Sequence, residues 1–185
     1  SDNGGFINEW NGRTVTNNFP LRSGKGALYE GGIRVPLIIH WPGVTQPGST
    51  SEYPVITMDL YPTMLHIAEI EEDHARSNAL EGIDLSPLIR DPLADMPQRN
   101  IYWHYPHYYH TTTPVSAIRS GNWKLIEYYE NRRKELYDLE NDMSENMDLS
   151  AEHPGKVSEL SDQLDQWKKA TGARIPTQND QLAGQ

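Results

Sequence analysis

The chain opens with SDNGG at residues 1–5, continues with LRSGKG at residues 21–26 and reaches YEGGIRVPLIIHWPG at residues 29–43. These three runs decide the fold and the site that we predict. Asp2 and Asn3 form a short cluster of oxygen ligands, on backbone that the following glycines allow to turn sharply and to approach an ion closely. Lys25 lies between two glycines, so its ammonium can come near a tetrahedral anion with no neighbouring side chains in the way.

Each motif also has an ordinary structural interpretation. Asp-Asn-Gly-Gly is common in turns, and a Gly-Lys-Gly triplet is often a solvated loop. The order of the two motifs, followed by Tyr-Glu-Gly-Gly-x-Arg-x-Pro and an apolar run that ends in Trp-Pro-Gly, is far more specific. In this order the sequence resembles the sulfatase family, the type I sulfuric ester hydrolases of the alkaline-phosphatase-like superfamily.

The resemblance implies roles for three residues of the opening stretch. Asp2 and Asn3 match a pair that ligates calcium in sulfatases, and Lys25 matches the lysine that contacts the sulfate group and takes part in catalysis. The likeness continues through MDLYPT at residues 58–63 and ELYDL at residues 135–139, so it covers nearly the whole chain.

The resemblance also implies a nucleophile that this chain does not supply. Sulfatases oxidise a Cys, or sometimes a Ser, within Cys/Ser-x-Pro-x-Arg to formylglycine, and that motif lies upstream of Asp-Asn-Gly-Gly. The chain has no Cys, and its nearest echo, DMPQR at residues 95–99, begins with an Asp that cannot become the aldehyde. We therefore expect a C-terminal fragment that is inactive alone and requires the N-terminal portion of its own catalytic domain.

Composition excludes some partners. A net charge of -10 argues against a nucleic-acid-binding surface, which needs clustered Lys and Arg. No apolar run is long enough to span a membrane, and no signal peptide is present in this sequence. The resemblance implies a periplasmic or extracellular enzyme acting on a sulfated small molecule or glycan.

The first part of the chain predicts a half of an α/β domain. The apolar run at residues 34–41 favours a strand buried on both faces, with His40 as a hydrogen-bonded core histidine. A helix is predicted from Thr57 or Asp59 to about Ile70, with one apolar face over the sheet. An acidic connection follows at residues 71–78, and a short helix or turn is expected at residues 83–90.

The rest of the chain predicts a small antiparallel sheet with a packed helix. Strands are expected at 101–103, 115–119, 123–129 and 134–139, with a tight turn at residues 120–122. Val157, Leu160, Leu164 and Trp167 form one stripe of a helix that Gly172 can end. By resemblance, residues 1–97 are the C-terminal part of the catalytic α/β domain and residues 98–185 are a small C-terminal α+β subdomain.

The densest run of polar aromatic residues is WHYPHYYH at residues 103–110. Zinc binding is disfavoured, because Pro106 breaks any helix that would align the histidines and no carboxylate lies among them. The loop could pack between domains, or it could bind substrate, since similar sulfatases bring this part of the small domain to the rim of the pocket. His104 and His107 are the candidate substrate-binding residues.

The predicted function is hydrolysis of a sulfate ester, on a carbohydrate hydroxyl. A phosphodiesterase or phosphonate hydrolase on the same scaffold is an alternative, because sulfate and phosphate esters share tetrahedral geometry. A third reading is a non-catalytic module that binds a glycan or takes part in assembly. A Cys/Ser-x-Pro-x-Arg motif upstream would favour the sulfatase.

Overall fold

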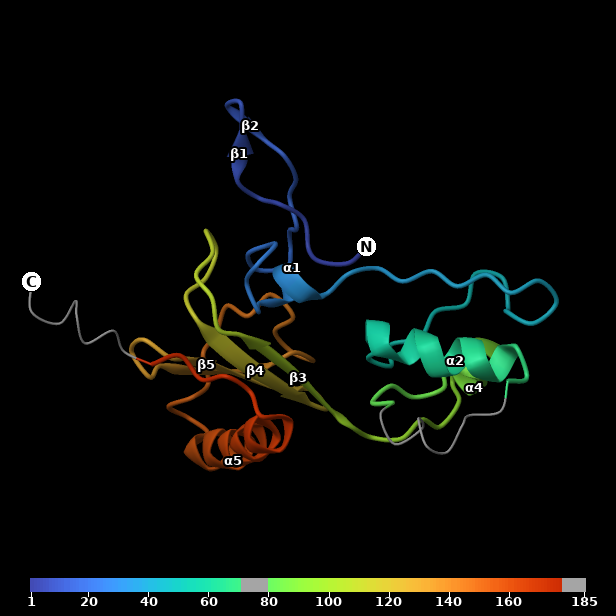
Figure 1. Cartoon of the computed structure of the whole chain (residues 1–185). Coiled ribbons are helices and arrows are strands. Elements are labelled where there is room, and N and C mark those ends of the chain that lie inside the picture. The colour runs from blue at the N-terminus through green and yellow to red at the C-terminus, as the bar shows by residue number, and fades with distance from the viewer. Residues whose placement is uncertain (71–79, 178–185) are drawn as a thin grey trace, which may run out of the picture. The chain divides into compact units, whose positions relative to one another are not determined.

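Four antiparallel strands form the main sheet in the computed structural model, which describes residues 1–70 and 80–177 (Figure 1). Gly121 has a φ of 58° in the turn between the second and third of these strands, a left-handed conformation that glycine adopts without strain. The sheet confirms the four strands predicted between residues 101 and 139. Each strand pairs with the next along the chain: β3 (Asn100–Tyr105), β4 (Val115–Ser120), β5 (Trp123–Tyr128) and β6 (Lys134–Asp138).

Contacts between residues divide the chain into two compact units. The sheet unit comprises Ser1 with residues 3–36 and 99–177, and the helical unit comprises Asp2 with residues 37–70 and 80–98. These units are sets of residues in contact, so the predicted division into domains at residue 97 stays a prediction. In the described part of the chain, no helix combines the length and apolar character needed to cross a bilayer.

Successive side chains of a strand point to opposite faces of a sheet. Both faces of the main sheet are covered by other segments of the sheet unit. Helix α5 (Pro154–Thr171) lies against one face (Figure 1). Leu160 and Leu164 of this helix are fully buried there, and Gly172 ends it with a φ of 66°. The predicted helix and its buried stripe are confirmed. The strand residues beneath α5 are Ile118, Leu125 and Leu136.

The opposite face of the sheet is covered by residues 27–29, which precede the short helix α1 (Glu30–Ile33). Tyr29 is 8% exposed and lies among the alternate strand residues that do not face α5. A two-stranded hairpin, β1 (Glu9–Trp10) with β2 (Arg13–Thr14), precedes this segment. The sheet residues under residues 27–29 are Val115, Ala117, Ile126, Tyr128 and Tyr137.

The helical unit contains a 3-10 turn, η1 (Thr57–Asp59), that runs into α2 (Leu60–Ile67), and a short helix, α4 (Ser86–Arg90). Asp59 is fully buried, and its carboxylate accepts the backbone N–H of Ile56 at 2.8 Å and of Ile83 at 3.0 Å. These bonds hold the segment before α4 against the start of α2. Two helices occur where they were predicted, but α2 ends at Ile67 rather than near Ile70, and the apolar face that was expected to cover the sheet is exposed at Met64 and Ile67. The acidic connection at residues 71–78 lies outside the described residues.

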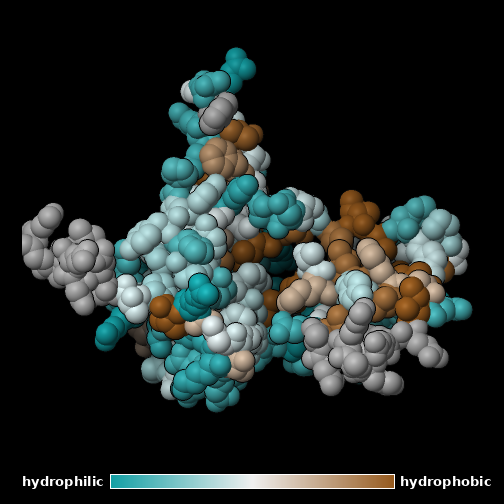
Figure 2. All heavy atoms as spheres, viewed as in Figure 1, coloured by the Kyte–Doolittle hydropathy of each residue, from teal (hydrophilic) through white to brown (hydrophobic). Residues whose placement is uncertain are grey.

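The strand predicted at residues 34–41 is wrong. Residues 34–41 pair with no strand in the described part of the chain, and Ile38 is 90% exposed. A strand is defined by hydrogen bonds to a neighbour, so an apolar composition alone does not produce one. His40 is exposed rather than a core histidine. Figure 2 shows apolar side chains gathered on the surface of the helical unit, where Leu37, Met58, Tyr61 and Met64 are also exposed.

Candidate functional site

The structure brings the Gly-Lys-Gly loop against the Asp-Asn-Gly-Gly segment. The backbone N–H of Lys25 donates to the carbonyl oxygen of Gly5 at 3.0 Å. The side chain of Asn18 links the same two segments, since its amide donates to the carbonyls of Gly5 and Ser23 at 3.0 Å each. Two motifs about twenty residues apart in the sequence therefore form one backbone assembly.

The glycines of these motifs allow the backbones to approach closely. The N–H of Gly4 donates to the carbonyl of Gly32 at 2.8 Å, and a Cβ added to Gly4 would overlap the carbonyl oxygen of Gly31. Any larger residue would force the two segments apart. The Tyr-Glu-Gly-Gly run is thus the backbone support of the opening segment, which explains why the three runs occur together.

Lys25 presents its side chain to solvent while its peptide is fixed. The residue is exposed, and its ammonium forms no ion pair with any residue in the ranges 1–70 and 80–177. The hydroxyl of Thr111 donates to the Lys25 carbonyl at 2.7 Å. A lysine without a carboxylate partner on a rigid backbone is suited to bind an anion.

A buried group of charges fixes the segment after Lys25 to the sheet. The ammonium of Lys124, which is fully buried, donates to carboxylate oxygens of Glu30 and Glu145 at 2.8 Å each. The second oxygen of Glu145 accepts the backbone N–H of Glu30 at 2.6 Å. Burial raises the pKa of Glu145, although the Lys124 ammonium lowers it. We call these three residues the buried charge triad.

A second polar network lies beside the triad. Tyr29 donates its hydroxyl to the carboxylate of Glu135 at 2.6 Å, and Tyr137 donates to the same oxygen at 3.0 Å. Arg22 stacks on the Tyr29 ring, with its guanidinium carbon 4.0 Å from the ring centroid. Burial, followed by the hydrogen bond to Glu135, raises the pKa of the Tyr29 hydroxyl. The network therefore holds the residues on both sides of Lys25 in place.

Sequence reasoning missed both groups. A signal for Lys124 was present, because strict alternation along β5 places it on the same face as Ile126 and Tyr128. Glu145 follows a polar stretch without periodicity, and its φ of 54° is unusual for a residue other than glycine. Nothing in the local sequence marks it as buried.

Asp2 and Asn3 supply donors that suit calcium, but only part of a site. Their side chains offer carboxylate and amide oxygens, the ligand type that a hard cation prefers, whereas calcium takes six to eight oxygens. Asn3 is half-buried, and its carbonyl accepts the Ser1 hydroxyl at 2.9 Å. Within the described ranges, no three His, Cys, Asp or Glu side chains gather as a metal cluster. The two residues fit the ion as a partial ligand set.

The two candidate histidines differ. His104 is on β3, and both of its ring nitrogens have protein partners, the Ser116 hydroxyl at 2.7 Å and the Arg174 carbonyl at 3.0 Å. Alternation along β3 places its side chain on the α5 face, opposite residues 27–29. His107 is exposed, with its ring 5.4 Å from that of Tyr105. The structure therefore does not bring His104 to the Lys25 segment, and both substrate-binding roles stay predictions.

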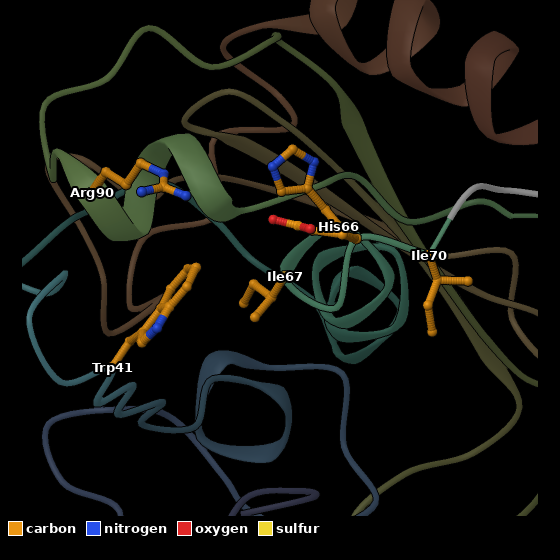
Figure 3. Close-up of a pocket in the computed structure, with 6 residues that line it drawn as sticks. Trp41, His66, Ile67, Ile70 and Arg90 are labelled. Atoms are coloured by element: carbon orange, nitrogen blue, oxygen red, sulfur yellow. The ribbon is translucent and has the colours of Figure 1, made fainter.

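The helical unit has a separate open hollow of about 510 Å³ (Figure 3). The Arg90 guanidinium carbon lies 5.1 Å from the centroid of the Trp41 ring, and His66 of α2 lies 3.4 Å from a carboxylate oxygen of Asp84. Ile67 and Ile70 complete its apolar wall. None of the residues predicted to bind metal or sulfate lines this hollow.

Comparison with known proteins identifies the family. Residues 23–170 match the model of the family described as N-sulphoglucosamine sulphohydrolase, C-terminal. The chain belongs to the sulfatase family. A sulfatase of Formosa agariphila is 37% identical over 164 residues, which are 84% of this chain and 29% of that protein. Steryl-sulfatase of Mus musculus is 28% identical over 99% of this chain and 33% of its own length.

Two solved structures share the fold. The structure of Ps i-CgsB in complex with k-i-k-neocarrahexaose has a TM-score of 0.72 and 30% identity, and the match covers 89% of this chain and 34% of that one. The structure of BT4656 in complex with its substrate D-glucosamine-2-N,6-O-disulfate has a TM-score of 0.65 and 30% identity, over 77% of this chain and 30% of that one. The expected fold class, an alkaline-phosphatase-like α/β fold with a four-stranded antiparallel sheet and a packed helix, is confirmed. The sulfatase chain described here spans about a third of the length of these relatives.

Proposed function

We propose that the complete protein containing this sulfatase chain hydrolyses a sulfate ester, and that Lys25 is the cation that holds the transferred sulfate. One observation carries the proposal. The Lys25 N–H donates to the Gly5 carbonyl at 3.0 Å, and this bond joins residues 24–26, which we call the lysine loop, to the segment that bears Asp2 and Asn3. A cation held near a sulfate oxygen stabilises charge that grows in the transition state, so it lowers the barrier rather than only binding substrate.

Asp2 and Asn3 would hold calcium together with ligands from outside this chain. When bound, the ion would supply positive charge against the sulfate oxygens. The nucleophile, a formylglycine in this family, would also come from another part of the protein, because this sequence contains no Cys/Ser-x-Pro-x-Arg motif. On this proposal the chain alone is inactive and depends on the N-terminal portion of the catalytic domain.

The substrate that we propose is a sulfated carbohydrate. Two of the similar structures are complexes with a neocarrahexaose and with a disulfated glucosamine. His107 is exposed on the loop that follows β3, where its ring nitrogens could donate to sugar hydroxyl or sulfate groups. His104 could do so only by exchanging a protein partner. A periplasmic or extracellular location is proposed on family membership.

Replacement of Lys25 in the complete enzyme tests the proposal. Lys25→Ala should lower kcat by about a hundredfold or more, as the loss of an oxyanion donor does. The readout is release of inorganic sulfate from 4-nitrophenyl sulfate and from a sulfated glucosamine, with folding checked by circular dichroism. The matched control is Lys169→Ala, an exposed lysine on α5, which should leave kcat unchanged. A folded Lys25→Ala enzyme that keeps most of its kcat would overturn the proposal.

A further inference from the structure

The peptide groups of Lys25 are held from two sides. Its N–H donates to the Gly5 carbonyl at 3.0 Å, and its carbonyl accepts the Thr111 hydroxyl at 2.7 Å. Thr111 belongs to the segment between β3 and β4, residues 106–114, which we call the aromatic loop. The donor is therefore more than eighty residues away in the sequence, on a loop that also carries two tyrosines and two histidines.

The aromatic loop also covers the next residue of the lysine loop. Gly26 has a φ of 93°, and a Cβ at this position would overlap the ring of Tyr109. Tyr109 and Thr112 close a turn by two backbone hydrogen bonds, at 2.9 and 3.2 Å. Tyr108 fastens the same loop by donating its hydroxyl to Glu130 at 2.7 Å. The ring of Tyr109 and the hydroxyl of Thr111 thus contact the lysine loop from a turn that is itself held by hydrogen bonds.

We propose that Thr111 and Tyr109 are positioning residues for Lys25, so that the aromatic loop sets the direction in which the ammonium reaches the sulfate; this rests on the function proposed above for Lys25. The lysine side chain is long and its ammonium has no carboxylate partner in the described residues, so the peptide at its base determines where it points. A displacement of about 1 Å at a reacting group can cost a hundredfold in rate.

The effect should appear in kcat rather than in KM. Neither Thr111 nor Tyr109 needs to contact substrate, because each acts on the backbone of the lysine loop. Loss of the Thr111 hydroxyl leaves the Lys25 carbonyl free to turn, which broadens the positions that the ammonium adopts. A cation that is present but badly positioned still attracts sulfate, so KM changes little. It stabilises the transition state less well, so kcat falls.

The test compares two neighbouring threonines in the complete enzyme. Thr111→Val should lower kcat by about tenfold with little change in KM. Thr112→Val is the matched control, since the Thr112 hydroxyl donates to its neighbour Thr113 at 2.9 Å and not to the lysine loop; it should leave both constants unchanged. Thr111→Ser, which keeps the donor, should restore kcat. Equal loss from both valine variants, or no rescue by serine, would overturn the proposal.

A double-mutant cycle separates this inference from the function on which it rests. In a Lys25→Ala background, Thr111→Val should have no further effect on kcat, because the ammonium that Thr111 positions is absent. Tyr109→Leu should behave in the same way as Thr111→Val in both backgrounds. If Lys25→Ala is silent, the proposed function fails. If Lys25→Ala lowers kcat but Thr111→Val lowers it equally with and without Lys25, only the positioning role fails.

Discussion

The sheet unit and the helical unit differ in how far their apolar side chains are buried. In the sheet unit, Val115, Ile118 and Leu125 are fully buried between α5 and residues 27–29. In the helical unit, Ile38 is 90% and Met64 61% exposed, and Figure 2 shows apolar surface over this unit. The strands of the first unit pair with their immediate neighbours in the sequence, whereas the apolar run at residues 34–41 has no such neighbour. Local pairing accounts for the difference.

The units differ in their charges as well. Lys124, Glu30 and Glu145 are removed from water together in the sheet unit. In the helical unit, His66 lies 3.4 Å from a carboxylate oxygen of Asp84, with side chains 57% and 31% exposed, and the two form an ion pair only when His66 is protonated. A solvated pair contributes little, while a buried group that loses one partner leaves an uncompensated charge. The strongest test of the comparison therefore lies in the buried charge triad.

Replacement of Lys124 should give the largest loss of stability. Lys124→Met keeps most of the side-chain volume but leaves the buried carboxylate of Glu145 without a cation and that of Glu30 with only the Arg34 guanidinium at 3.6 Å. The free energy of unfolding should therefore fall by about 3 to 5 kcal/mol. Urea denaturation followed by circular dichroism measures it. Lys156→Met is the control, because Lys156 pairs with Glu159 on the surface of α5, and it should cost no more than about 0.5 kcal/mol.

The pH dependence of the stability loss in the Lys124→Met variant tests whether charge causes that loss. Burial raises the pKa of Glu145, so the folded state takes up a proton before the unfolded state as the pH falls. Without the ammonium of Lys124, that pKa rises further. The deficit should therefore be largest at neutral pH and should shrink as the pH is lowered towards 5. A deficit that is the same at both pH values would mean that packing, rather than charge, explains the loss.

A pair of aliphatic truncations compares the two units directly. Leu164→Ala removes a fully buried side chain from the face between α5 and the sheet, so it should destabilise the chain by about 2 to 5 kcal/mol. Ile38→Ala removes a side chain that is 90% exposed and should change stability by no more than about 0.5 kcal/mol. Thermal or urea unfolding of both variants measures the two losses of stability, which can then be compared. Similar losses would show that residue 38 is packed and that the contrast between the units is false.

Prediction from sequence succeeded where structure is locally determined. Two short strand-like runs on either side of the turn at residues 120–122 predict the hairpin of β4 and β5, and the apolar stripe ending before Gly172 predicts α5. The strand at residues 34–41 failed because composition shows which residues avoid water but not whether a pairing partner exists. His40 failed with it, since its predicted burial depended on that strand.

The site stays a prediction from the motifs. The bond from the Lys25 N–H to the Gly5 carbonyl joins the backbones of the two motifs at Gly5. The contacts of Thr111 with Lys25 and of Lys124 with Glu30 were not predictable, because each joins residues more than eighty positions apart and depends on how the sheet is placed. Spacing along a chain carries no information on such pairs. The occupied ring nitrogens of His104 illustrate the same limit, since one partner, Arg174, follows α5.

A smaller loss, which exceeds only those expected for Lys156→Met and Ile38→Ala, concerns Asp148, which fastens the segment after β6 to the sheet. Its carboxylate accepts the backbone N–H of Leu136 at 3.0 Å and of Ser150 at 2.9 Å. Desolvation raises the pKa of Asp148, but these hydrogen bonds outweigh it and the pKa is lowered overall. Because the side chain is exposed, solvent screens the charge, and Asp148→Asn should cost only about 1 kcal/mol at pH 7.

Acid titration shows whether that cost comes from the carboxylate. A lowered pKa in the folded state means that the Asp148 contribution is complete above the unfolded value of about 3.9 and is lost as the pH falls through the folded value. Wild-type and Asp148→Asn chains should therefore differ in their free energy of unfolding at pH 7 and converge once the pH falls below the lowered folded pKa of Asp148. Urea denaturation at a series of pH values measures this convergence. Parallel curves would show that the loss comes from the geometry of the turn and not from the charge of the Asp148 carboxylate.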